Sequence, residues 1–141
     1  MKNFAAITTA QIWVLDQQKA LDFYVGKLGL EVKTDVSQGT FRWLTVGVPG
    51  EALPEVALLV PGPPVMDEKT AAQVRELVTK GAIGGLVMRT EDCFGLYERL
   101  KANGVEFTQA ATEHPYGVDC GIRDPFGNLI RVLQPKKAPK A

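Results

Sequence analysis

The chain has 141 residues, of which 45% are hydrophobic, so it is long enough for one well-packed domain or for two small modules that share a core. Its sixteen basic and sixteen acidic side chains balance, which argues against binding to nucleic acid or to an anionic membrane through net charge. No apolar stretch approaches the roughly 20 residues that cross a bilayer, and the first residues do not resemble a secretory signal. We therefore expect a cytoplasmic protein in which Cys93 and Cys120 are free thiols, since they lie far apart without a CxxC spacing.

The first half of the chain predicts a strand, a helix and three further strands. Residues Ile7 to Leu15 alternate in polarity, as in a half-buried strand. Asp16 is placed to cap the following helix, and Gly29 to end it. The strands that follow are expected at Leu30–Lys33, Phe41–Val46 and Val56–Val60.

The second half repeats this order after a Pro-rich break and a helix at Asp67–Thr79. Gly29 and Gly104 lie 75 residues apart in matching contexts, and this offset aligns Asp16 with Glu91. The repeated elements are a strand at Leu86–Thr90, a helix at Glu91–Asn103, a strand beginning at Val105, and strands at Val118–Arg123 and Leu129–Leu133. Such a repeat indicates two modules that pack together.

These elements predict an α+β fold made of two tandem βαβββ modules. The modules are expected to form a curved, cup-shaped mixed sheet with the helices on its convex face. We expect one domain over residues 1–135, with module 1 at 5–62, a linker helix within 63–82, module 2 at 83–135 and a flexible tail at 136–141.

Taken in their order along the chain, the motifs resemble those of the vicinal oxygen chelate superfamily. This superfamily includes glyoxalase I, bleomycin-resistance and fosfomycin-resistance proteins and extradiol dioxygenases. The resemblance covers nearly the whole chain, and it specifies the fold more closely than the activity. The residues that carry it are Val14-Leu15-Asp16, Ala20-Leu21-Asp22-Phe23-Tyr24, Leu28-Gly29-Leu30, Leu100-Lys101-Ala102-Asn103-Gly104-Val105 and Asp124-Pro125-Phe126-Gly127-Asn128.

The resemblance also locates the positions where metal-dependent members carry their ligands. These positions fall near Thr9, Ala57, Gly85 and Arg131, where the family usually has His, Glu or Gln, His and Glu. The four residues present are poor ligands for zinc, nickel or iron. His114 is the chain's single histidine, so a site built on two histidines cannot form within one chain. We therefore expect no metal and no other cofactor.

Arg131 is the most unusual of these residues, and two interpretations are open. Its guanidinium can receive a carboxylate, phosphate or enolate oxygen of a ligand where other members hold a metal. Alternatively, it is a solvated or ion-paired strand residue, with Asp119 or Glu55 as partner. We favour the second interpretation, because most charged strand residues are solvated.

Aromatic residues are the other candidates for a ligand-binding surface. Alternation places Gln11 and Trp13 opposite Ile12 and Val14, so they can line the cup, although Trp13 can instead pack between modules or at a dimer interface. Trp43 is a further candidate, but its strand has apolar residues on both faces, which leaves its facing open.

The loop before the seventh strand supplies two polar candidates. Tyr116 can donate a hydrogen bond to a ligand, or it can belong to a plain surface loop. His114 can act as a general base, but we prefer a surface position because the sequence identifies no orienting carboxylate. Cys93 lies at a helix start, and without a nearby base we expect a small buried residue there.

We expect a homodimer that binds a small molecule, with no nucleic-acid or membrane partner. The expected function is metal-independent sequestration of an aromatic or amphipathic metabolite, drug or toxin by Gln11, Trp13, Trp43, Tyr116 and Arg131. The alternatives are a glyoxalase-like lyase or isomerase, or a dioxygenase-like enzyme, with a metal site that the sequence does not reveal, and a structural or regulatory module with a vestigial cavity. The 67–79 helix is a candidate lid or interface element.

Overall fold

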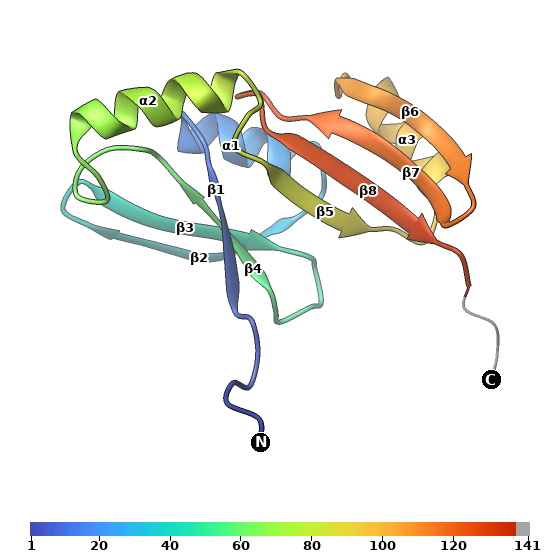
Figure 1. The fold of residues 1–141 in the computed structure, drawn as a ribbon, viewed down its shortest axis with the longest axis horizontal. Coiled ribbons are helices and arrows are strands. Elements are labelled where there is room, and N and C mark those ends of the chain that lie inside the picture. The colour runs from blue at the N-terminus through green and yellow to red at the C-terminus, as the bar shows by residue number, and fades with distance from the viewer. Residues whose placement is uncertain (138–141) are drawn as a thin grey trace. The chain divides into compact units, whose positions relative to one another are not determined.

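The computed structural model describes residues 1–137, so residues 138–141 of the predicted flexible tail lie outside the described residues. The chain divides into two compact units, Met1–Val78 and a second unit that begins at Thr79 (Figure 1). Within residues 1–137, no helix has both the length and the apolar character needed to cross a membrane.

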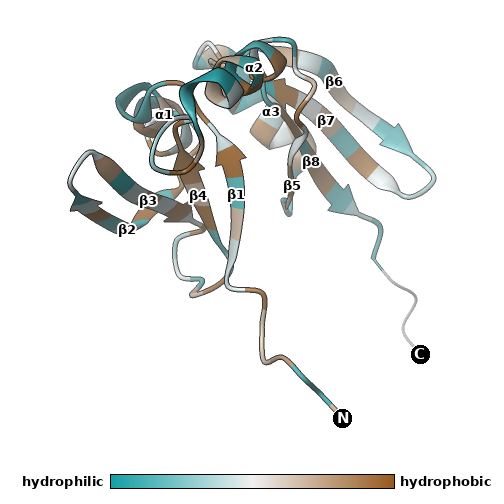
Figure 2. Ribbon diagram, turned by 60° about the vertical axis from the view of Figure 1, so that its left-hand side comes forward, coloured by the Kyte–Doolittle hydropathy of each residue, from teal (hydrophilic) through white to brown (hydrophobic). Residues whose placement is uncertain are grey.

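The first unit has the predicted βαβββ order, followed by the predicted helix. Its elements are β1 (Thr9–Trp13), α1 (Gln17–Tyr24), β2 (Glu31–Gln38), β3 (Phe41–Gly47), β4 (Glu55–Leu59) and α2 (Glu68–Thr79). The four strands form one mixed sheet in the order β1-β4-β3-β2, in which β1 runs parallel to β4 and the other neighbours are antiparallel. α1 packs against β4, which is coloured as hydrophobic along most of its length in Figure 2. Residues that are fully buried here include Val14, Tyr24, Leu44 and Leu58.

The second unit repeats this arrangement. Its elements are β5 (Gly85–Arg89), α3 (Cys93–Ala102), β6 (Phe107–His114), β7 (Gly117–Arg123) and β8 (Leu129–Pro135). The sheet order is β5-β8-β7-β6, with β5 parallel to β8, which is the pattern of the first sheet. α3 packs against β6, β7 and β8, and Cys93, Cys120, Ile122 and Ile130 are buried. The predicted α+β class and the two βαβββ modules are thus confirmed.

The helix boundaries follow from their capping residues. Asp16 has an extended backbone and accepts a hydrogen bond from the backbone N–H of Lys19 at 2.9 Å, as predicted for an N-cap. After the helices, Gly29 and Gly104 have φ values of 80° and 81°, a left-handed conformation that favours glycine. The predicted alignment of Asp16 with Glu91 is wrong by one residue, because Asp92 is the N-cap of α3 and accepts from Gly95 N–H at 3.0 Å.

Replacement of Asp92 by alanine is expected to lower the free energy of unfolding by about 1 kcal/mol, because the N–H of Gly95 loses its acceptor. Glu91→Ala is the matched control: it removes a neighbouring exposed carboxylate that does not cap the helix, and it should have little effect. Urea denaturation followed by circular dichroism measures both variants. An equal loss in the two would argue against Asp92 as the cap.

Candidate functional site

In the first unit, the strand register places the three sequence-predicted residues on one face of the sheet. Gln11 pairs with Ala57, and Ala57 pairs with Thr45 on β3. Cross-strand partners share a face and alternate residues return to it, so Gln11, Trp13 and Trp43 lie together. This fixes the facing of Trp43, which the sequence left open. We call this surface the tryptophan face.

The side chains of Gln11, Trp13 and Trp43 on the tryptophan face are exposed enough to contact another molecule. Gln11 is exposed, and Trp13 and Trp43 are half-buried. Ile12 and Leu58, on the opposite face, are buried. A half-buried tryptophan offers a flat apolar surface that is held in place by its own packing.

Glu55 is a carboxylate of the tryptophan face, because it pairs with Thr9 in the same alternation. The hydroxyls of Thr45 and Thr34 both donate to its Oε1, the second at 2.9 Å. These two hydrogen bonds lower the pKa of Glu55, despite the opposing effect of its partial burial. Glu55 is therefore an ionised, hydrogen-bonded residue of the first sheet and is not the partner of Arg131.

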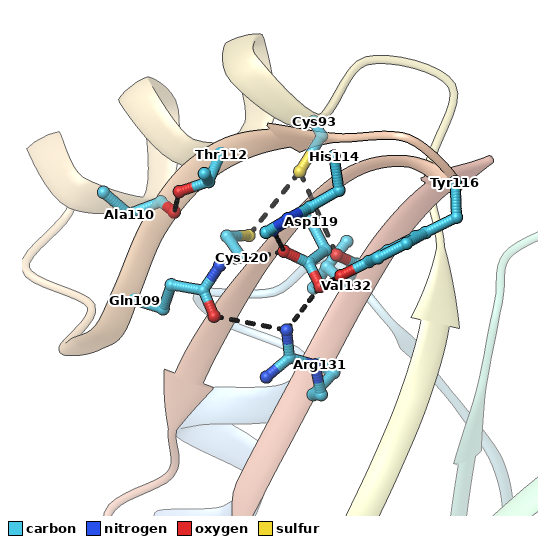
Figure 3. Close-up of polar contacts among 10 residues, drawn as sticks. All are labelled: Cys93, Gln109, Ala110, Thr112, His114, Tyr116, Asp119, Cys120, Arg131 and Val132. Carbon is cyan, nitrogen blue, oxygen red and sulfur yellow. Dashed lines mark hydrogen bonds and ion pairs between the residues drawn. The ribbon is translucent and has the colours of Figure 1, made fainter. Parts of the chain in front are cut away.

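In the second unit, the open face of the sheet carries a polar cluster that centres on Asp119. Arg131 pairs with Gly121, which in turn pairs with Gln109, and Asp119 lies two residues before Gly121 on the same face. His114 reaches this face from the end of β6, and Tyr116 reaches it from the turn between β6 and β7. We call Gln109, His114, Tyr116, Asp119 and Arg131 the Asp119 cluster (Figure 3).

Asp119 receives polar contacts from all four other members of the cluster. Gln109 Nε2 donates to Oδ1 at 2.9 Å, and Nε2 of His114 lies 3.0 Å from the same oxygen. The Tyr116 hydroxyl donates to Oδ2 at 2.8 Å, and the guanidinium of Arg131 also donates to Oδ2. Because an ionised carboxylate only accepts, His114 carries its proton on Nε2. The rings of His114 and Tyr116 stack at 4.9 Å with an interplanar angle of 5°.

The contacts of Asp119 determine its charge. The side chain is 4% exposed, and burial alone would favour the neutral acid. The hydrogen bonds from Arg131, Tyr116 and Gln109 and the positive charge of Arg131 outweigh burial and lower its pKa from 3.8 to about 2. In the other direction, the hydrogen bond to Asp119 raises the pKa of Arg131 and that of Tyr116. The cluster therefore holds an ion pair and a neutral phenol near neutral pH.

The lowered pKa of Asp119 predicts a loss of stability in acid. Its folded-state pKa lies below the ordinary value, so its contribution is present above pH 3.8 and is lost as the pH falls through about 2. Relative to Asp119→Asn, the wild type should lose its advantage in free energy of unfolding over this interval. Urea denaturation of both proteins at several pH values measures the difference. A difference that stays constant across the interval would contradict the assignment.

One nitrogen of the Arg131 guanidinium is held by neighbouring side chains, and the rest of the group can contact a ligand. Its NH2 donates to Asp119 and, at 3.2 Å, to Oε1 of Gln109. Its side chain is 49% exposed. The predicted ion pair with Asp119 is therefore present, and it leaves the guanidinium able to donate to a ligand oxygen as well. The two interpretations of Arg131 are compatible.

The four positions that correspond to metal ligands do not fit a metal. Thr9, Ala57 and Gly85 offer at most one hydroxyl, and the guanidinium of Arg131 carries a positive charge. A Cβ on Gly85 would lie 1.7 Å from the backbone oxygen of Leu129, so this strand position has no room for a side chain. Among residues 1–137, no group of three or more His, Cys, Asp or Glu side chains is placed to hold a metal ion.

The two cysteines lie on the helix side of the second sheet, behind the Asp119 cluster. Both are free and buried, with their Sγ atoms 3.7 Å apart. Burial raises the pKa of the Cys93 thiol and raises that of Cys120 to about 12. A thiol that stays protonated is a poor nucleophile, so Cys93 has the predicted role of a small buried residue.

Most of the role of Asp119 was not predicted from the sequence. Asp119 was expected only as one of two partners for Arg131, and no carboxylate was assigned to His114. His114 was also expected in a loop, whereas it ends β6. The available signal was the tight turn at Asp124–Asn128, which pairs Arg123 with Leu129 and so brings alternate residues of β7 and β8 to one face.

Comparison with known proteins places this chain among relatives of similar length. The model of the Glyoxalase/Bleomycin resistance protein/Dioxygenase superfamily matches residues 6–132. The uncharacterized protein YurT of Bacillus subtilis (strain 168) is 32% identical over 128 residues, which are 91% of this chain and 98% of YurT.

Two solved structures are similar over nearly their whole length. UcmS2 aligns with a TM-score of 0.87 and 42% identity, covering 92% of this chain and 98% of UcmS2. TnmS3, an antibiotic binding protein from Streptomyces sp. CB03234, aligns with a TM-score of 0.76 and 27% identity, covering 96% of this chain and all of TnmS3. With the family model matching most of its length, the chain belongs to the glyoxalase/bleomycin resistance protein/dioxygenase superfamily.

Proposed function

We propose that the protein binds a small organic molecule without a metal, and that the tryptophan face of the first unit and the Asp119 cluster of the second unit are each a binding surface in their own right. The observation that carries the proposal is the half-exposed guanidinium of Arg131, which Asp119 and Gln109 hold along one edge. A fixed donor on a sheet face can bind a ligand oxygen with little further loss of side-chain freedom. Tyr116, whose ring is 54% exposed, extends the cluster with an aromatic surface.

The ligand class that we propose is an aromatic or amphipathic metabolite, drug or toxin. Trp13 and Trp43 offer apolar surface, and Gln11 beside them offers an amide that can donate and accept. The similarity to TnmS3, an antibiotic binding protein, supports sequestration of such a molecule. It favours a binding protein over a glyoxalase-like enzyme.

Metal independence is part of the proposal and follows from the donors present. A catalytic zinc or iron centre needs three or more side-chain ligands such as His, Cys or carboxylate, at metal-bonding distance. Arg131 and Gly85 occupy two of the four corresponding positions, and neither can supply a ligand atom. The carboxylate of Asp119, which lies on the same sheet face as Arg131, is already engaged in an ion pair with it.

We also propose that the working form is a homodimer. Each sheet has two strands at its edges, β1 and β2 in the first and β5 and β6 in the second. Edge strands expose unpaired backbone groups, and a second copy of the chain can cover them. Light scattering after size-exclusion chromatography should give about twice the 15.3 kDa mass of one chain, and a monomer would contradict this part of the proposal.

Fluorescence titration with 8-anilino-1-naphthalenesulfonate, an aromatic amphipathic anion, tests each surface by itself. Saturable quenching of the two tryptophans, which both lie on the tryptophan face, reports binding there, and the emission of the dye itself reports binding at the Asp119 cluster. Arg131→Ala should weaken the affinity measured from dye emission about tenfold, which is the effect of losing one charge-assisted hydrogen bond.

Arg42→Ala is the matched control for this titration. Arg42 is also a strand arginine in an ion pair, with Asp35, but alternation places it on the face opposite Trp43. It should leave the affinity unchanged. Saturation that is equally strong in the Arg131 variant would remove the Asp119 cluster from the proposed site.

A further inference from the structure

A polar pocket lies in the second unit, where β5 and β8 end and α3 begins. It has a volume of about 240 Å³, which is smaller than the roughly 300–1,000 Å³ of pockets for drug-sized ligands. The residues that line it are Arg89, Thr90, Glu91, Gln134, Pro135, Lys136 and Lys137. It is therefore suited to a small ion or to one functional group of a larger molecule.

The charge of this pocket is strongly positive for a chain with no net charge. Arg89, Lys136 and Lys137 contribute three cations, and Glu91 contributes one carboxylate. Other arginines are paired with carboxylates, as in Arg42–Asp35 and Arg75–Glu68. Within residues 1–137, the three cations of the pocket form no ion pair. Their charge is therefore available to a bound anion.

Backbone hydrogen bonds fix the walls of the pocket. The N–H of Thr90 donates to the carbonyl of Leu133 at 3.0 Å, and the N–H of Lys136 donates to the carbonyl of Tyr116 at 3.1 Å. Oε1 of Gln134 accepts the N–H of Cys93 at 2.9 Å, at the start of α3. The residues on both sides of the pocket are thus held by the sheet and by α3.

We infer that this pocket is a binding site for a compact dianion, namely inorganic phosphate or the phosphate group of a small monoester. Three unpaired cations around a small pocket attract two negative charges more strongly than one. Arg89 offers a planar pair of donors, and the lysines offer point charges. Nothing in this inference depends on the ligand of the tryptophan face or of the Asp119 cluster.

The test is a ¹H–¹⁵N NMR titration of the full chain with potassium phosphate and, separately, with methyl phosphate, at an ionic strength held constant with potassium chloride. Each probe should produce saturable shifts of the backbone amides that line the pocket, namely those of Arg89, Thr90, Glu91, Gln134, Lys136 and Lys137. Binding of either probe supports the site, and methyl phosphate identifies it as one that accepts a monoester. Shifts spread evenly over all lysine-bearing surfaces, or no saturation with either probe, would overturn it.

Single-residue variants test whether the NMR chemical-shift changes arise from phosphate binding in the pocket. Arg89→Ala and Lys136→Ala should each weaken phosphate binding about tenfold. Lys27→Ala removes the same charge from an exposed site beyond α1 in the first unit and should leave the affinity unchanged. Because Arg89 and Lys136 are exposed, their variants should keep the wild-type spectrum outside the pocket. Unchanged affinity in both pocket variants would refute the assignment.

Discussion

Replacement of Asp119 by alanine is expected to weaken 8-anilino-1-naphthalenesulfonate binding about tenfold and to lower the free energy of unfolding by about 2 kcal/mol. The variant deprives four side chains of their common acceptor, and it releases Arg131 from the edge that holds it. Because these partners are partly exposed, water can replace some of the lost hydrogen bonds, which keeps the loss of stability moderate.

Asp35→Ala is the control for this variant. Asp35 also pairs with a strand arginine, Arg42, but its side chain is 40% exposed, compared with 4% for Asp119, and exposed ion pairs contribute about 0–1 kcal/mol. Denaturation and fluorescence titration of the two variants give the comparison. If Asp119→Ala behaved like Asp35→Ala in both measurements, the Asp119 cluster would have no organising role.

Replacement of Gly85 by alanine is expected to lower the free energy of unfolding by about 3 kcal/mol. The added Cβ would lie 1.7 Å from the carbonyl oxygen of Leu129, a backbone atom of the neighbouring strand. Relief of this contact requires β5 and β8 to shift in their parallel pairing, which begins at Gly85 and Leu129.

Gly39→Ala separates crowding from backbone strain. Gly39 has a φ of 61° in the turn between β2 and β3, and a Cβ there would meet no atom within 4 Å. Its replacement should cost about 1 kcal/mol, from the left-handed conformation alone. Thermal or urea denaturation compares the two variants. A smaller loss for Gly85→Ala than for Gly39→Ala would mean that β5 accepts a side chain at this position.

The large loss of stability that we predict for a side chain at Gly85 also bears on whether this position could carry a metal ligand. A histidine at this position would need the same space as alanine and more. Close packing of β5 against β8 therefore bars a larger side chain at this position. One substitution would not create a metal site.

The secondary structure was predictable because local signals determine it. Asp16 and Gly29 bound the first helix through capping and backbone preference, and the alternation from Ile12 to Val14 sets the facing of β1. The same reasoning erred at Glu91, where two acidic residues stand side by side. Only the backbone shows that Asp92 makes the capping hydrogen bond.

The candidate site was less predictable because it depends on pairing between strands. Trp43 has apolar neighbours on both sides, so its facing follows only from the register of β3 with β4. Asp119 on β7 has partners from β6, β8 and the Tyr116 turn, and a single sequence does not give the bulges in the β6–β7 pairing. Arg131 could be identified as unusual, but its partner had to be chosen between two carboxylates.

The proposal of metal-free binding is tested most directly by one calorimetric titration with parallel metal analysis. Purified protein is dialysed against EDTA and titrated with 8-anilino-1-naphthalenesulfonate, before and after addition of equimolar Zn²⁺ or Ni²⁺, while elemental analysis measures the metal that co-purifies. We expect the same affinity in every sample and no stoichiometric metal in the purified protein. A transition metal that co-purifies at one ion per site, with binding lost after EDTA, would contradict the account.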